Sequence, residues 1–69
     1  LDAVRQDAIV NLCFNLGLTR LMGFKNAMGA MAVGDYEKAA DEFLDSRWAN
    51  QVGQRALDVT HMIRTGEYP

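Results

Sequence analysis

The sequence has few of the residues that would build a metal centre, a disulfide framework or a membrane span. Its 69 residues include one cysteine, Cys13, and one histidine, His61. No internal disulfide can therefore form, and no zinc-ligand spacing is present. No apolar run approaches the roughly 18 to 20 residues that a membrane span requires. We expect no metal, no cofactor and no membrane span in this segment, with Cys13 as a small buried apolar residue and His61 near the surface.

Positive charge is also scarce. Seven Lys and Arg residues stand against nine Asp and Glu residues, which gives a net charge of −2. Nucleic acid is therefore not expected as a partner, because binding to phosphates requires a basic face, and a helix-turn-helix DNA binder is disfavoured. The length allows one small domain and no more. Because the chain begins at Leu1 rather than Met, we expect residues 1–69 to be a fragment.

The apolar residues recur with the period of helices and nowhere alternate as in strands. We expect a first helix from Asp2 to Leu16, a helical turn from Thr19 to Met22 broken by Gly23, and further helices at 24–33, 36–44, 47–51 and 53–64. The first is nearly apolar in its second half, which predicts a central helix wrapped by shorter ones. The glycine at position 29, inside a helix, predicts close packing there. The predicted fold is all-α, a compact multi-helix lobe.

Specific blocks resemble the phage-type lysozymes over essentially the whole chain. The most specific is Ser46-Arg47-Trp48 followed by Asn50-Gln51 and Arg55-Ala56. The supporting blocks, in chain order, are Leu1 to Arg5, Asn11, Phe14, Gly17, Gly23-Phe24, Ala39-Ala40 and Arg64-Thr65-Gly66.

The resemblance implies that residues 1–69 are the carboxy-terminal helical lobe of a two-lobed enzyme that cleaves peptidoglycan. Glycosidases of this kind need two carboxyl groups flanking the scissile bond. In the family these groups belong to an amino-terminal lobe, so none of the catalytic positions falls in this chain. We therefore expect this segment alone to be inactive, with peptidoglycan and the amino-terminal lobe as its partners. The segment does not distinguish a free endolysin from a virion-associated lysozyme.

The candidate substrate-binding residues are Phe14, Asn15 and Trp48. The resemblance implies an apolar platform at Phe14, beside which Asn15 would offer an amide. Trp48 is either a core anchor or the wall of a cleft. The family pattern has a serine at Ala27 and an asparagine at Glu42, both of which bind the peptide arm of peptidoglycan. Alanine cannot hydrogen-bond and glutamate adds a charge, so recognition of the peptide stem is expected to differ here.

Two arginines are candidates for contact with the missing lobe. Arg55 lies in the first turns of the last helix, where a cation gains nothing from the helix dipole, and this indicates a specific anionic partner. The resemblance implies that this partner is the catalytic glutamate, and that Arg47 forms an inter-lobe ion pair. The alternative for both is a solvated charge of little energetic worth.

One other class of function stays open. A non-enzymatic helical interaction module would use Met22, Met28 and Met31 as an adaptable apolar surface. An exposed methionine patch would favour that hypothesis over the lysozyme one.

Overall fold

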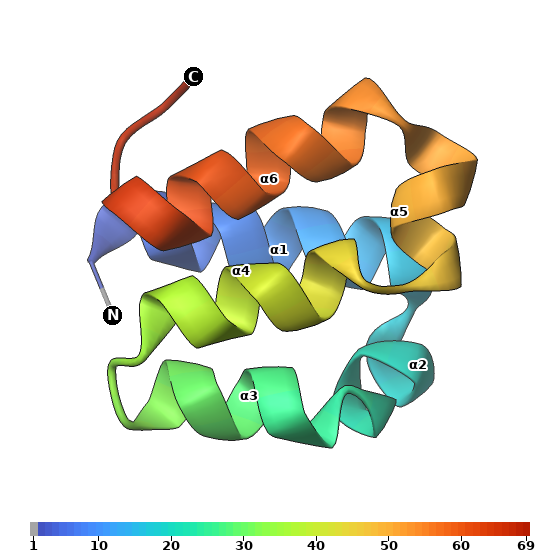
Figure 1. Ribbon diagram of the computed structural model, residues 1–69, viewed down its shortest axis with the longest axis horizontal. Coiled ribbons are helices and arrows are strands. Elements are labelled where there is room, and N and C mark those ends of the chain that lie inside the picture. Colours follow the sequence, from blue (N-terminus) through green and yellow to red (C-terminus); the bar gives the residue numbers. More distant parts are fainter. Residues whose placement is uncertain (1) are drawn as a thin grey trace.

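Six helices connected by short turns make up the computed structural model, which describes residues 2–69 (Figure 1). The helices are α1 (Ala3–Leu16), α2 (Leu18–Gly23), α3 (Lys25–Ala32), α4 (Tyr36–Leu44), α5 (Arg47–Val52) and α6 (Gln54–Thr65). No strand occurs between residues 2 and 69. The prediction of an all-α fold is confirmed.

Local sequence explains where the helices begin and end. Asp2, Asp35 and Ser46, residue types that are favoured at N-caps, each accept a backbone N–H with the side chain and so cap α1, α4 and α5. Gly17 ends α1 with φ +81°, a conformation that other residues adopt at a cost. The amino-terminus of α6 has no side-chain cap, because the residue at its N-cap is Gly53.

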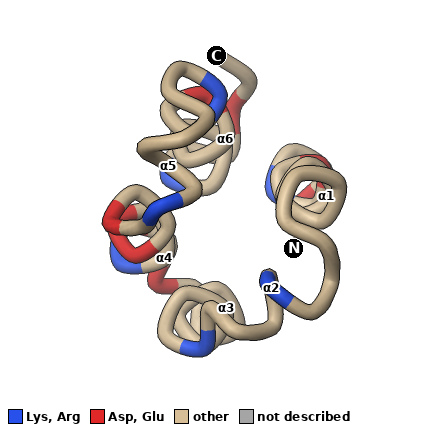
Figure 2. Tube along the Cα trace, turned by 90° about the vertical axis from the view of Figure 1, so that its right-hand side faces the viewer, with Lys and Arg blue, Asp and Glu red and all other residues tan. Residues whose placement is uncertain are grey.

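The helices surround a single core. Viewed end-on, they follow one another around a ring, so that α1 lies between α2 and α6 (Figure 2). The largest fully buried side chains come from four different helices: Leu12, Leu21, Phe43, Thr60 and Ile63. Thr60 is compatible with this core because its hydroxyl donates to the carbonyl of Ala56 at 2.6 Å.

The helix predicted to be central and wrapped by shorter ones, α1, is covered by the other helices on one face. Its buried residues, Ala8, Leu12 and Leu16, are four apart and form one face. Val10 and Phe14 project from the opposite face, where Val10 is 51% and Phe14 87% exposed. Apolar content alone overstated the burial of this helix, since the ring covers only its inner face.

Two glycine predictions also need correction. Gly23 is the last residue of α2, and the break falls at Phe24, whose ring packs on Phe43 with centroids 5.1 Å apart. An added Cβ at Gly29 would meet no atom within 4 Å, so no close packing occurs there. Gly29 lies on the exposed side of α3, where a larger side chain would have room.

Arg5 joins the ends of three helices. Its Nε donates to the carbonyl of Ile63 at 2.7 Å and its Nη2 to that of Arg64 at 3.3 Å, both in the last turn of α6. Its guanidinium lies 3.7 Å from the ring centroid of Tyr36, at the start of α4. The start of α1 is thereby held beside the end of α6, which makes these two helices antiparallel (Figure 1).

Candidate functional site

A groove of about 400 Å³ lies between α1 and α6. Four polar residues and two buried apolar residues line it: Asn11, Gln54, Arg55 and Asp58, with Val59 and Met62. Because α1 and α6 are antiparallel, Asn11 in the second half of α1 faces the first half of α6. The buried core residue Val59 and its neighbour Met62 hold this wall of the groove in place.

The polar groups of the groove are only partly paired. The Nδ2 of Asn11 donates to the carbonyl of Asp7 at 3.1 Å, and the Nε2 of Gln54 donates to Oδ1 of Asp58 at 3.1 Å. Among residues 2–69, the side chain of Arg55 has neither an ion pair nor a hydrogen bond. The groove therefore presents an unpaired guanidinium beside a carboxylate and two amides.

The position of Arg55 agrees with the electrostatic argument made from the sequence. It is the second residue of α6, where the partial positive charge of the helix terminus disfavours a cation. By contrast, Arg64 lies in the last turn of the same helix and donates to Glu37 and Asp41. The hydrogen bond to Asp41 raises the pKa of Arg64. Arg55 is thus a cation without a partner inside the described part of the chain.

The groove holds one carboxylate, which limits its chemistry. Hydrolysis of a glycosidic bond needs two carboxyl groups, about 5 to 9.5 Å apart, on either side of the bond. Asp58 is the only acidic residue lining the groove, and its Oδ1 already accepts from Gln54. The groove can bind and orient charged groups, but its own residues do not supply a catalytic pair.

The predicted substrate-binding residues belong to the end of α1 and to α5, which lie toward the same end of the molecule in Figure 1 but on different sides of the ring in Figure 2. Phe14 projects into solvent, and Asn15 donates from Nδ2 to the carbonyl of Asn11 at 2.7 Å. Trp48 is only 2% exposed, and its Nε1 is a buried donor without a partner. Trp48 is thus a core anchor, and any role in a cleft would be to support surface residues.

The remaining predicted residues do not line the groove. Ala27 is buried in α3 and Glu42 is half-buried in α4. Arg47 is exposed at the start of α5 and has no ion pair among residues 2–69. Gln54 and Asp58 were not predicted as site residues, and Asn11 was named only among the residues that carry the family resemblance. Asn11 precedes the buried Leu12, and Asp58 precedes the buried Val59. This position beside a buried face was the sequence signal that could have indicated them as site residues.

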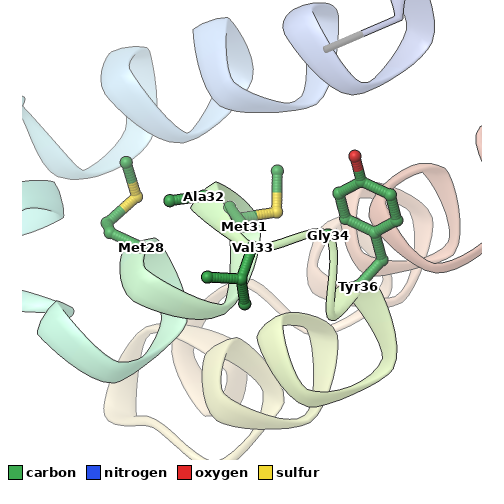
Figure 3. Close-up of a pocket in the computed structure, with 6 residues that line it drawn as sticks. All are labelled: Met28, Met31, Ala32, Val33, Gly34 and Tyr36. Atoms are coloured by element: carbon green, nitrogen blue, oxygen red, sulfur yellow. The ribbon is translucent and has the colours of Figure 1, made fainter.

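A second, mostly apolar pocket of about 470 Å³ lies at the end of α3. Met28, Met31 and Tyr36 point from it toward α1, with Ala32, Val33 and Gly34 completing the lining (Figure 3). Met31 is buried, Met28 is half-buried and Met22, in α2, is 57% exposed and does not line the pocket. The three methionines predicted to form one exposed surface therefore do not share one.

Residues 2–69 contain neither a cluster of metal ligands nor a membrane-spanning helix. No group of three or more His, Cys, Asp and Glu side chains is placed to hold a metal ion. None of the described helices combines the length and the hydrophobicity needed to cross a bilayer.

Two curated proteins are similar to the chain over most of its length. One is the probable T4-type lysozyme 1 of Dictyostelium discoideum, 32% identical over 66 residues, or 96% of the chain. The other is the pre-baseplate central spike protein Gp5 of Enterobacteria phage T4, 40% identical over 62 residues, or 90% of the chain. The chain spans 39% of the first protein's length and 11% of the second's.

No family model matches the sequence. Both similarities nevertheless extend across nearly all six helices, and one of the two proteins carries the name of the family that the block around Ser46-Arg47-Trp48 indicated. The resemblance inferred from the sequence is confirmed: the chain is a segment related to the phage-type lysozymes.

Proposed function

We propose that residues 1–69 are the helical, cleft-forming lobe of a lysozyme that hydrolyses the β-1,4 bond between N-acetylmuramic acid and N-acetylglucosamine. The catalytic carboxylates belong to another lobe of the same protein. That protein is either a free endolysin or a lysozyme that forms part of a phage particle. The observation that carries this proposal is the unpaired guanidinium of Arg55 in the groove between α1 and α6. The two relatives, both much longer than this chain, support a role as one part of a larger protein.

Arg55 acts in this proposal as a positioning residue. A guanidinium presents two parallel N–H groups to a carboxylate, which sets the direction of that carboxylate more strictly than an ammonium does. The catalytic acid of the other lobe would accept from Arg55 and be held toward the glycosidic oxygen. The same cation favours the ionised carboxylate, so it also lowers the pKa of the acid that it orients.

The surface near the groove would contact the sugar. Phe14 offers its exposed ring as an apolar platform, and Asn15 keeps its Oδ1 available while Nδ2 donates to the carbonyl of Asn11. Trp48, which is buried in the core, would support these surface residues from the interior of the protein. Arg47, exposed and unpaired at the start of α5, would form a second ion pair between the lobes.

This protein would recognise the peptide stem of peptidoglycan differently from the family pattern, which has a serine at Ala27 and an asparagine at Glu42. Ala27 is buried and its side chain has no polar atom, so it contributes no hydrogen bond to a peptide. Glu42 is half-buried on α4 and adds a negative charge. Stems that carry a free amino group would therefore be preferred over stems that carry only carboxylates at this position.

The test compares peptidoglycan hydrolysis by the full-length protein with that by residues 1–69 alone. The full-length protein is expected to be active and the isolated chain inactive. Replacing Arg55 by methionine should lower kcat/KM by about 10- to 100-fold, because an orienting, charge-assisted contact contributes about 1.5 to 3 kcal/mol. Arg20→Met, which removes an exposed cation that does not line the groove, is the matched control.

The pH profile adds a readout that a purely structural role of Arg55 would not move. Activity falls on the alkaline side when the general acid loses its proton. Removal of the cation raises the pKa of that acid, so the alkaline limb should move to higher pH in Arg55→Met. Hydrolysis by the isolated chain, or an Arg55→Met variant that matches Arg20→Met in both rate and pH profile, would contradict the proposal.

A further inference from the structure

Two opposite charges in the groove stand one turn apart on α6 without pairing to each other. Arg55 and Asp58 are three residues apart, a spacing at which side chains on a helix are neighbours. Both line the groove, yet no ion pair forms between them. Asp58 instead accepts the amide of Gln54 at 3.1 Å.

Helix electrostatics explain why this pair does not close. Ion pairs on a helix are most favourable when the acid precedes the base, and here Arg55 precedes Asp58. The amide of Gln54 supplies a neutral donor to Oδ1 and leaves the charge of Asp58 without a cation. Asp58 is half-buried and Arg55 is exposed at the surface of the groove. Both charges therefore remain available to groups outside the described chain.

We propose that the groove is a two-charge docking site for another part of the longer polypeptide, which presents a carboxylate to Arg55 and a lysine or arginine to Asp58. The proposal rests on the function proposed above and extends it by naming the chemistry of the second contact. Charge complementarity is the argument: a segment bearing one sign of charge would be attracted by one residue of the groove and repelled by the other.

The order of the two charges also sets the register of docking. Arg55 lies toward the amino-terminal end of α6 and Asp58 one turn further along. If the partner segment shifts by one turn, its carboxylate meets Asp58, or its cation meets Arg55. Such like-charge contacts reject the wrong register. Asp58 is therefore a specificity-determining residue for the position of the lobe that carries the catalytic acid.

The experiment uses charge reversal in the full-length protein. Asp58→Lys introduces repulsion against the proposed cation, and Asp58→Asn keeps an oxygen for Gln54 while removing the charge. Glu67→Lys makes the same charge change at an exposed position outside the groove and is the control. Circular dichroism establishes that each variant is folded. Docking is read from hydrogen exchange of residues 54–58, and peptidoglycan hydrolysis is measured in parallel.

At low ionic strength, Asp58→Lys is expected to increase hydrogen exchange of residues 54–58 by about 10-fold, and Asp58→Asn by about 3-fold. Both effects should shrink in 0.5 M salt, because counterions screen the contact. One Lys→Glu or Arg→Glu replacement elsewhere in the full-length chain should restore protection to Asp58→Lys. Glu67→Lys should leave the exchange unchanged.

The proposal is overturned if Asp58→Lys behaves like Glu67→Lys, or if no reversal of a Lys or Arg elsewhere rescues it. Protection that develops only on addition of a peptidoglycan stem peptide would assign the groove to substrate and would also overturn it. Failure of the proposed function is a separate outcome. If the wild-type protein does not hydrolyse peptidoglycan, hydrogen exchange of residues 54–58 still shows whether the groove is occupied by another part of the protein.

Discussion

Removal of the Arg5 side chain should destabilise this fold more than removal of any exposed charge. Four of its contacts reach other helices or the helix cap: two carbonyls in the last turn of α6, the ring of Tyr36 in α4 and the carboxylate of Asp2. The side chain is only 15% exposed. Arg5→Met keeps most of the apolar stem and removes the guanidinium, so it isolates the polar contacts from the packing of the side chain.

The expected loss is the sum of four unequal contributions. The short hydrogen bond to the carbonyl of Ile63 contributes about 1.5 kcal/mol, and the longer one to Arg64 about 0.5 kcal/mol. The contact with Tyr36 adds about 0.5 to 1 kcal/mol, and the partly exposed pair with Asp2 about 0.5 kcal/mol. The total is about 3 kcal/mol. A domain of this size has roughly 3 to 10 kcal/mol in all, so the loss is a large share.

Urea unfolding, followed by the fluorescence of buried Trp48, measures this loss directly. Arg5→Lys should lose about half as much as Arg5→Met, because it keeps the charge but has one donor nitrogen in place of the planar fork that reaches both carbonyls. Arg20→Met is the control, since Arg20 is exposed. If Arg5→Met unfolds within 0.5 kcal/mol of the control, the bridge between α1 and α6 does not stabilise the fold as argued.

Four further predictions concern local structure. Gly29→Ala should raise the free energy of unfolding by about 0.5 to 1 kcal/mol, since the added Cβ meets open space in a helix. Gly66→Ala should lower it, because φ is +73° and the Cβ would lie 2.9 Å from the capping carboxylate of α1; thermal unfolding of both variants tests the opposite signs. Ser46→Ala should lower the stability by about 1 kcal/mol through loss of the α5 cap, with Ser46→Thr close to wild type in urea unfolding. The hydrogen bond from Tyr68 to Asp7 raises the pKa of Tyr68 above 10.0. This contact stabilises the fold below pH 10.0 and is lost as the pH rises through the raised pKa. Absorbance at about 295 nm should show Tyr68 ionising at lower pH in Asp7→Asn, and an unchanged titration would count against the contact.

The helices and most of their caps were predictable because they depend on near neighbours. Ala56, Val59, Thr60 and Ile63 recur at helical spacing along α6, and all four residues are buried. The element predicted at 36–44 has those bounds in the structure. Periodicity and capping act within one or two turns, so the sequence alone carries that information.

The candidate site was predictable only in part. Arg55 stood out because a cation at the start of a helix opposes the helix dipole, and the structure places it in a groove without a partner. Whether Asn11 and Asp58 share that groove depends on how α1 packs against α6. Two residues 47 positions apart become neighbours only through that packing, and no local signal in either helix encodes it.

The sequence by itself determined the six helices, their caps, the buried stripe of α6 and the relation to the phage-type lysozymes. It could do so because helix formation and motif spacing are local properties of the chain. Only the tertiary structure decided that α1 turns Val10 and Phe14 outward, that Trp48 lies in the core, and that Arg55 and Asp58 share one groove unpaired. Burial and charge pairing depend on which helix faces outward and which faces a neighbour, and that is decided by packing across the whole chain.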